Sequence, residues 1–245
     1  MIAVETVYDT LLTMIREDKR GLSLSPDEYT RIANLVNEQV YAKKYAEYEK
    51  TLSIGTALST FMSSAPNVAL IGNTAVLPSD YKIMIGKPYS YSAARYMDYV
   101  TMLELHERTE DYLTKYSTTY PLWTYIGEAG GVKLITVYPA TITGQIWIRY
   151  LREATAPFYD YYVNDTTAKI TYMDVDANVV IPSGSTYRSG TAGDGVTSFA
   201  SLSEDWEWGI DEFHLILSIF AEKMGIALPD NFLVEAGNLE ETKAE

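Results

Sequence analysis

The stretch YPLWTYIGEAGGVKLITVYPATITGQIWIRYLREA, from Tyr120 to Ala154, alternates apolar and polar residues along much of its length. A period of two residues is typical of β-strands, whose side chains point to alternate faces of a sheet. The chain turns at Ala129-Gly130-Gly131 and again near residues 140–144. These turns separate predicted strands over residues 122–126, 132–138 and 142–151. Because the stretch carries no histidine or cysteine, we expect its edges and faces to serve as parts of a larger assembly.

Two helical patterns precede the strands. Apolar residues recur at helical spacing from Val4 to Arg20, and Gly21 is placed to end that helix. Ser25-Pro26-Asp27-Glu28 is a capping box with proline at the first helical position. The second pattern continues to Phe61, which predicts about 35 helical residues and a length of roughly 50 Å. Such a helix is longer than a small domain needs.

Between the second helix and the opening stretch the sequence is less regular. Small and turn-forming residues occupy Ser63 to Asn73. A helical turn or short helix is predicted over residues 101–116, with Met102, Leu105 and Leu113 facing inward. Further short strands are predicted over residues 73–77, 82–85, 89–96, 158–163, 169–173 and 178–181.

The C-terminal part changes from strand to loop to helix. Residues 182–203 are rich in Gly, Ser and Thr, which predicts a loop. A strong apolar stripe from Ile210 to Met224 predicts a helix that Gly225 closes. The order of elements predicts an α+β fold, in which N- and C-terminal helices form a bundle and a β-rich antiparallel sheet or sandwich is inserted. The expected boundaries are 1–66 for the N-terminal helices, 67–204 for the β-rich insert, and 205–245 for the C-terminal helices and acidic tail.

Composition limits the function. The 245 residues are 47% hydrophobic and carry a formal net charge of −14, with no cysteine. The acidity argues against a duplex-binding protein, because phosphates are neutralised by clustered Lys and Arg. It is compatible with a surface past which DNA slides. No secretory signal and no stretch of 18 apolar residues is present, so no membrane span is expected. The 21 tyrosines suit half-buried surfaces and interfaces.

Two loops resemble ligand-binding motifs only in part. Residues 190–197 have the glycine spacing of a phosphate-binding loop, but Val196 stands where the lysine is required. A surface loop is therefore favoured. Residues 174–178 open like a calcium loop, but Val179 and Ser185 stand where glycine and glutamate are required. A polar turn is favoured near Asp174, and a bound divalent ion is left open.

The remaining polar residues do not mark out a catalytic site. His106 lies among charged residues and is expected to be solvated, whereas His214 beside the apolar stripe is expected to be structural. Glu204, Asp205 and Glu207 precede the helix near Ile210, where they suit its dipole. Acid–base catalysis needs carboxyls held in differing environments, and no pair is marked out for this. We expect no catalytic residues, no cofactor, no metal ligands and no enzymatic activity.

Several stretches resemble the head-to-tail connector, or ring, proteins of tailed bacteriophages, in particular of crAss-like and other short-tailed phages. The resemblance covers nearly the whole chain in the order of its elements and includes the C-terminal helical pair. It is carried by REDKRG (16–21), LSPDEYTRIANLVNEQVY (24–41), LPSDY (77–81), YPLWTYIGEAGGVKLITVYP (120–139) and IRYLREATAP (148–157). These motifs are structural in character.

The resemblance implies a structural virion protein. Such proteins form a ring, commonly of twelve copies, beneath the portal, and they extend the DNA channel toward the tail. Their helices pack side by side around the ring, and the β-rich part projects outward or contacts the next ring. The implied partners are other copies, the portal and neighbouring tail proteins, with viral DNA passing through the lumen and no membrane. The implied locations are the virion and, during assembly, the host cytoplasm.

Two other classes of function stay open. One is a carbohydrate-binding or adhesin-like tail component that uses aromatic rings as sugar platforms. Its candidate residues are Trp123, Trp147, Tyr159, Tyr161 and Tyr162. The other class is a hydrolase with a carboxylate pair. Under the connector interpretation, the segment from Ala227 to Glu245 docks on a partner, and the alternative is that it folds back on its own helices. Its candidate docking residues are Leu228, Phe232, Leu233 and Leu239.

Overall fold

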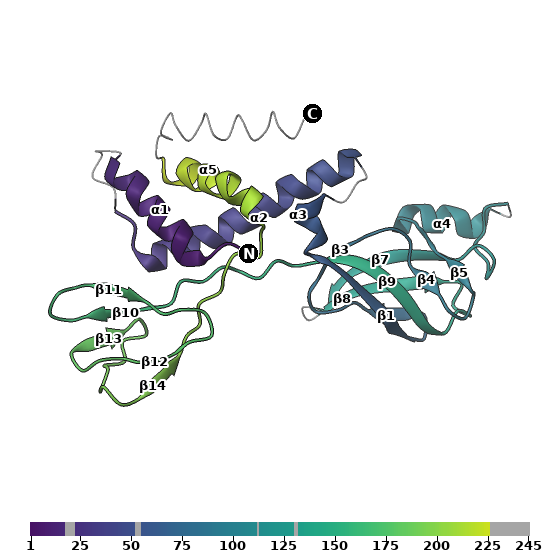
Figure 1. Ribbon diagram of the computed structural model, residues 1–245. Helices are drawn as coiled ribbons and strands as arrows, with labels where there is room; N and C mark the ends of the chain where they lie inside the picture. The colour runs from purple at the N-terminus through teal and green to yellow at the C-terminus, as the bar shows by residue number, and fades with distance from the viewer. Residues whose placement is uncertain (18–22, 52–54, 112, 130–131, 226–245) are drawn as a thin grey trace. The chain divides into compact units, whose positions relative to one another are not determined.

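The protein has an α+β fold, as predicted. The computed structural model describes residues 1–17, 23–51, 55–111, 113–129 and 132–225 (Figure 1). The chain divides into two compact units. Residues 1–60 and 154–245 form one, called here the helical unit, and residues 61–153 form the other, called the barrel unit.

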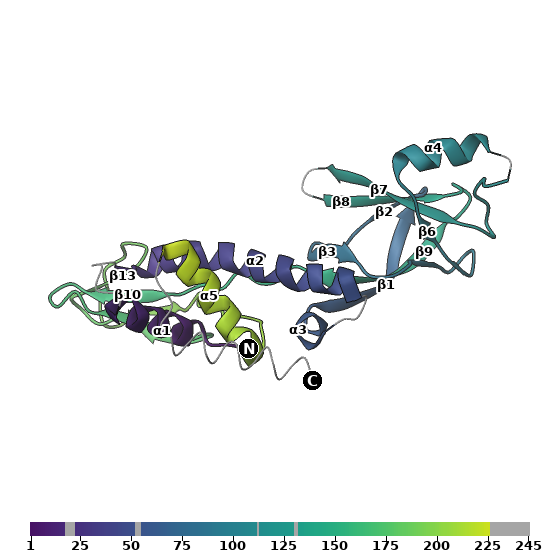
Figure 2. The same cartoon turned by 90° about the horizontal axis from the view of Figure 1, so that it is seen from above.

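The helical unit is organised around α1 (Val4–Glu17), α2 (Pro26–Thr51) and α5 (Phe213–Met224), with α5 packed against the other two (Figure 2). The ring of Tyr29 in α2 stacks on Phe220 of α5 with centroids 5.3 Å apart. Trp206 is fully buried, and its indole N–H donates to the Tyr29 hydroxyl at 3.2 Å. Large aromatic side chains therefore supply much of the apolar area that holds these helices together.

The predicted helix boundaries are partly confirmed. The Glu28 N–H donates to the Ser25 hydroxyl at 3.3 Å, so the second helix begins at the predicted cap. Gly225 ends α5 in the left-handed conformation, with φ of 67°, which favours glycine. The predicted continuation of the second helix to Phe61 is wrong. Gly55 has an extended backbone, with φ of −64° and ψ of 163°, and it begins the separate short helix α3 (Thr56–Ser59).

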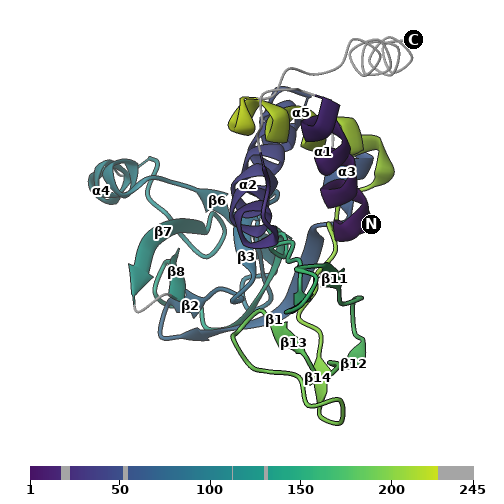
Figure 3. The same ribbon diagram turned by 90° about the vertical axis from the view of Figure 1, so that its left-hand side faces the viewer.

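The helical unit also contains two small sheets, which lie on one side of α1 (Figures 1 and 3). The first has the order β11 (Ile170–Tyr172), β10 (Tyr161–Asn164), β13 (Ser185–Tyr187), and in the second β12 (Asn178–Val180) pairs with β14 (Ser198–Ala200). β13 and β14 fall within residues 182–203, where the sequence predicts only a loop. Strands of three residues are too short to show an alternating pattern in the sequence. They are stabilised instead by a small apolar cluster, in which Tyr187 of β13 and Phe199 of β14 pack with Met173 and Ile181.

Within the described part of the barrel unit, nine strands form one sheet. They are β1 (Met62–Ile71), β2 (Thr74–Val76), β3 (Tyr81–Met84), β4 (Tyr89–Ser90), β5 (Arg95–Tyr96), β6 (Asp98–Tyr99), β7 (Leu122–Ala129), β8 (Val132–Tyr138) and β9 (Gly144–Arg152). Their order is β5-β4-β9-β1-β2-β8-β7-β6, and β3 pairs with β9. The two terminal strands, β5 and β6, are separated only by the buried Met97, so the sheet closes on itself. The closure is partial, because β6 pairs only with the first two residues of β7, Leu122 and Trp123.

The strands of the opening stretch are confirmed, with shifted ends. β7 runs on to Ala129, and β9 begins at Gly144. The region from Ser63 to Asn73 was expected to be turn-forming, but most of it belongs to β1. Its Pro66 lies where the register with β9 shifts between Ala65 and Val68. At such a bulge a proline removes no ladder hydrogen bond, which reconciles it with a long strand.

The helix α4 (Met102–Glu110) is a short helix within the predicted range, but two of its three predicted inward residues are exposed. Thr101 and Glu104 form a complete capping box at its start. Leu105 is buried as predicted, but Met102 and Leu113, predicted to face inward, are 57% and 88% exposed. The extended backbone of Asp111 ends the helix before Leu113, so that residue does not share the helical face of Leu105.

The unit boundaries differ from the expected insert over residues 67–204. The chain enters and leaves the barrel on neighbouring strands, because Met62 of β1 pairs with Leu151 of β9. Beyond Glu153 it hydrogen-bonds to α2, where the Asn37 side-chain amide donates to the Thr155 carbonyl at 3.1 Å. Residues 154–204 consequently belong with the helices, although they look like the barrel strands in sequence.

Candidate assembly surfaces

A buried tyrosine cluster forms the centre of the helical unit. The Tyr8 ring lies 5.1 Å from that of Tyr29 and 4.6 Å from that of Tyr159. The Tyr8 and Tyr29 hydroxyls donate to the carbonyls of Leu24 and Val4, at 3.0 and 3.1 Å. Burial is the main cause that raises the pKa of Tyr29 and of Tyr159. These phenols therefore stay protonated, and those of Tyr8 and Tyr29 act as structural donors.

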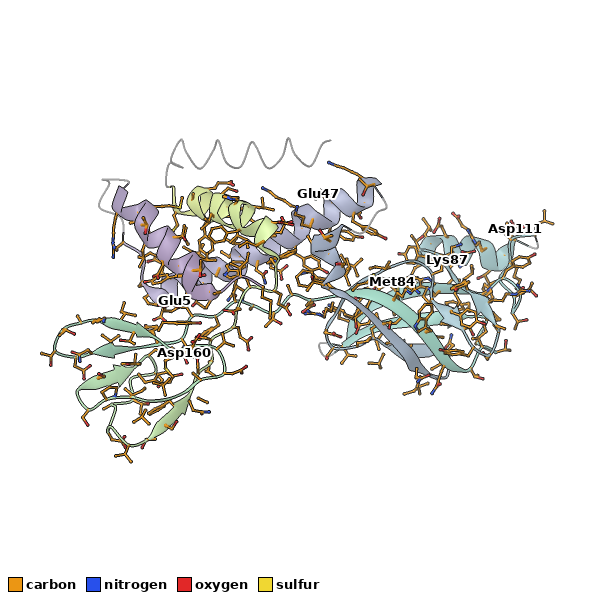
Figure 4. All side chains as sticks on the ribbon, viewed as in Figure 1. Glu5, Glu47, Met84, Lys87, Asp111 and Asp160 are labelled. Atoms are coloured by element: carbon orange, nitrogen blue, oxygen red, sulfur yellow. The ribbon has the colours of Figure 1, made fainter. Side chains whose placement is uncertain are left out.

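Asp160, labelled in Figure 4, is a fully buried carboxylate with its partners in place. One oxygen accepts from Arg188 Nε at 2.7 Å. The other accepts from the Tyr187 hydroxyl at 2.8 Å and the Leu202 N–H at 2.9 Å. Because both oxygens are hydrogen-bonded, this buried charge ties the start of β10 to the end of β13 and to the segment after β14.

Exposed carboxylates gather where α1 meets the turn after β11. Glu5 (labelled in Figure 4), Asp9 and Asp174 are exposed, and we call these three residues the acidic surface. Partial burial and the nearby charges of Asp9 and Asp174 raise the pKa of Glu5. Asp9 and Asp174 therefore each lie close enough to Glu5 to repel its carboxylate.

The net charge belongs entirely to the helical unit. Of the 19 Lys and Arg residues and the 33 Asp and Glu residues, 8 of each kind lie in residues 61–153. The barrel unit is thus formally neutral. The rest of the chain holds 11 basic and 25 acidic residues, and hence the whole net charge of −14. The two units present electrostatically different surfaces.

The outer side of the barrel carries a group of aromatic residues. Tyr89 of β4 is paired in register with Tyr96 of β5 on one side and with Trp147 of β9 on the other. Ile146 and Ile148, which flank Trp147, are buried, so Trp147 and Arg149 point outward. Tyr91 is exposed, and its ring contacts that of Tyr89. We call Tyr89, Tyr91, Tyr96, Trp147 and Arg149 the aromatic face.

The phosphate-loop-like segment is a surface loop, as favoured. Asp194 accepts the N–H groups of Val196 and Thr197, at 2.8 and 2.6 Å. Hydrogen bonds from the side chain and backbone of Thr197 lower the pKa of Asp194 to about 2. Close packing explains the glycine at position 193, because a Cβ there would come within 2.6 Å of Ile181. Donors that would bind a phosphate are thus committed to the loop's own carboxylate.

The calcium-loop-like segment forms a tight turn. The Ala177 N–H donates to the Asp174 carbonyl at 3.2 Å, and Asp176 adopts a positive φ of 58°. Within the described parts of the chain, no group of three or more His, Cys, Asp and Glu side chains is arranged to hold a metal ion.

The other predicted polar residues are separate from one another. His106 is exposed, with Nε2 4.0 Å from Glu110. His214 is half-buried in α5, where its ring contacts Phe213. Asp205 accepts the Val4 N–H at the start of α1, and Glu207 accepts the Thr155 N–H at 2.7 Å. The predicted dipole role of Asp205 therefore applies to α1, a helix distant in sequence, and not to α5.

Three of the five aromatic residues proposed for sugar binding are not available at the surface. Trp123, Tyr159 and Tyr161 are buried. Trp147 and Tyr162 are partly exposed but belong to different units. The sequence pattern missed the aromatic face because Tyr89, Tyr91 and Tyr96 come from very short strands and a turn. The predicted docking residues Leu228, Phe232, Leu233 and Leu239 lie outside the described residues.

No model of a known protein family and no curated protein matches the sequence. Among the described residues, no helix is both long enough and apolar enough to cross a membrane.

Proposed function

We propose that the protein is a structural component of a bacteriophage head-to-tail connector, in which copies form a ring that extends the portal channel. The observation that carries the proposal is the separation of charge between the two units: the helical unit holds the whole net charge of −14 and the barrel unit is neutral. A channel for DNA is best lined by acidic surface, which repels phosphates, whereas contacts between proteins are better made by neutral aromatic surface.

In this proposal α1, α2 and α5 act as a helical bundle that packs beside its neighbours around the ring. Their buried aromatic contacts, such as Tyr29 on Phe220 at 5.3 Å, support a rigid bundle. The barrel is a closed unit inserted between α3 and residue 154, and a closed sheet offers its outer face to a neighbour. The resemblance to connector proteins supports a ring of twelve copies, contacts with the portal and tail proteins, and a place in the virion.

Two experiments test the proposal. Virions of the phage that encodes the chain are purified and analysed by mass spectrometry, and antibodies against the chain are used to label them for electron microscopy. We expect the chain in the particles, with label at the single vertex that carries the tail. A chain absent from virions, or labelled all over the capsid, contradicts the connector function. Genes next to the coding sequence should encode portal and capsid proteins, and their absence would count against it as well.

A further inference from the structure

The aromatic face has the composition of the energetic centre of a protein interface. Tyr, Trp and Arg are the residues that dominate binding energy in such interfaces. Tyr91 and Tyr96 are 50% and 59% exposed, although both are large apolar rings. Their rings meet Tyr89 edge to face, at interplanar angles of 86° and 67°. Rings tilted in this way form an irregular surface, which suits a protein partner better than the flat face of a sugar.

Arg149 adds a fixed positive charge to this face. Its guanidinium carbon lies 4.6 Å from the centre of the Trp147 ring, so stacking holds the side chain in place. In the part of the chain that the structure describes, no carboxylate lies within ion-pair distance of Arg149. A planar donor group that is already held in position binds a carboxylate at little cost in side-chain entropy. The partner should therefore be acidic.

The protein itself carries a surface of that chemistry. The helical unit has 14 more acidic than basic residues. On it, Glu5 and Asp9 share one face of α1, four residues apart, and α1 lies beside the strand that leads to Asp174, since Tyr159 contacts both Tyr8 of α1 and Tyr172 of β11. Crowded like charges are relieved when a cation docks among them. The acidic surface of a second copy can thus supply the carboxylates that would pair with Arg149 on the aromatic face.

We propose that the aromatic face of one copy docks on the acidic surface of the next copy, head to tail. Because the two surfaces differ, each copy can use both at once, and repeated contacts generate a closed ring or a filament. The link to a connector ring rests on the proposed function, but the contact between two copies does not.

Two full-length variants test the contact. Arg149→Glu reverses the charge of the aromatic face, and Asp9→Lys with Asp174→Lys reverses the acidic surface, all at exposed positions. Lys115→Glu, in the loop after α4, is the matched control for the first. Asp165→Lys with Glu222→Lys is the matched control for the second. Association is measured by sedimentation velocity at low salt and again as the salt concentration is raised.

We expect the wild-type chain and both controls to form oligomers that dissociate as salt screens the contact. Each test variant alone should associate at least about tenfold more weakly, because a like charge replaces a complementary one. Mixed in equal amounts, the two test variants should associate again, because the intact aromatic face of one meets the intact acidic surface of the other, and the two reversed surfaces also carry opposite charges. This mixture result is specific to a head-to-tail contact.

Three results overturn the inference: a wild-type chain that stays monomeric, an Arg149→Glu chain that associates like the wild type, or a mixture that remains monomeric. They are distinguishable from failure of the proposed function. If virions contain the chain and the Arg149→Glu variant is incorporated as efficiently as the wild type, the interface is wrong and the connector function stands. If the mixture regains association but virions lack the chain, the interface stands and the connector function is wrong.

Discussion

Asp205 accepts a hydrogen bond from the Val4 backbone N–H at 2.9 Å, although 201 positions separate the two residues. Beside it, Ile2 and Trp206 exchange two backbone hydrogen bonds of 3.0 Å. Residues from the C-terminal part of the chain, Asp205 and Trp206, therefore hold the start of α1 in place. A carboxylate at this place satisfies a free N–H group and interacts favourably with the helix dipole.

Replacing Asp205 by alanine should destabilise the helical unit by about 1 kcal/mol, the usual cost of a lost helix cap. The measurement is the free energy of unfolding from urea denaturation followed by circular dichroism. Asp165→Ala is the control, because Asp165 is an exposed carboxylate in a turn and no helix begins there. Equal stability of the two variants would show that Asp205 does not act as a cap.

Removal of the buried Asp160 carboxylate should be more costly. Asp160→Ala leaves Arg188, whose side chain is 25% exposed, and the Tyr187 hydroxyl without their acceptor. We expect a loss of about 3 kcal/mol, since breaking a buried ion pair leaves an uncompensated charge. A double-mutant cycle with Arg188→Ala measures the coupling between the two residues. A coupling near zero would contradict the structural role given to the pair.

The sequence predicted the fold class and the regular elements, but not how distant segments combine. The strands β7 and β8 and the cap at Ser25 follow local rules of period and capping, and they were found. β13, β14 and the closure of the barrel depend on pairing between distant residues, which no local pattern displays. Residues 154–204 were assigned to the β-rich insert because their local pattern is that of a strand. Their contact with α2 is a tertiary property.

The candidate surfaces were less predictable than the elements. The abundance of tyrosine indicated interfaces, but it did not separate buried Tyr29 and Tyr159 from exposed Tyr91 and Tyr96. Burial distinguishes them, and it depends on the complete fold. Counting charged residues along the sequence would have revealed the charge difference between the two units, but only if the unit boundaries had been placed at residues 60–61 and 153–154. With the expected insert over residues 67–204 the contrast is diluted.

Stability should fall in strongly alkaline solution. Burial, and then the hydrogen bond and charge of Asp27, raise the pKa of Tyr161 to about 12, and burial with the charges of Asp205 and Asp174 raises that of Tyr172 to about 12. Both have an ordinary value of 10.0. Because folding raises these values, the stabilising contribution is complete below about pH 10 and is lost as the pH rises through about 12.

The free energy of unfolding in urea, measured at several pH values between about 9 and 12, checks this expectation. Tyr172→Phe removes one of the ionising groups, so its stability should depend less steeply on pH in the same range. A wild-type curve that is flat from about pH 10 to 12 would contradict the assigned environments.

The purified chain should not retain duplex DNA at moderate salt. The net charge of −14 repels phosphates, and the described basic side chains Lys44 and Arg188 are paired with Glu212 and Asp160. Gel-shift and filter-binding assays over a range of salt concentrations provide the measurement. Tight retention that weakens as salt rises would argue against an acidic lumen, because it would reveal a basic surface that contacts DNA.

Truncation after Gly225 should remove a docking segment and leave the fold intact. α5 already ends at Gly225, and its apolar residues Ile216, Leu217 and Phe220 are buried by the rest of the helical unit. The segment beyond carries Leu228, Phe232, Leu233 and Leu239 among acidic residues, and a segment this short does not hold a regular structure alone in water. It therefore needs a surface to pack against. We expect the truncated chain to unfold at nearly the same temperature and to lose its binding to the portal protein of the same phage, which a pull-down with purified components measures.

The full-length variant with Leu228→Ser, Phe232→Ser and Leu233→Ser is the matched test, because it keeps the length and charge of the segment while removing its apolar contacts. If these apolar residues dock in a groove of the portal, the serine variant should lose binding as completely as the truncated chain. Loss of binding by the truncated chain alone would assign the contact to the acidic residues instead. A large fall in the unfolding temperature of both variants would place the segment in the core of the helical unit, and unchanged binding by both would show that it takes no part in docking.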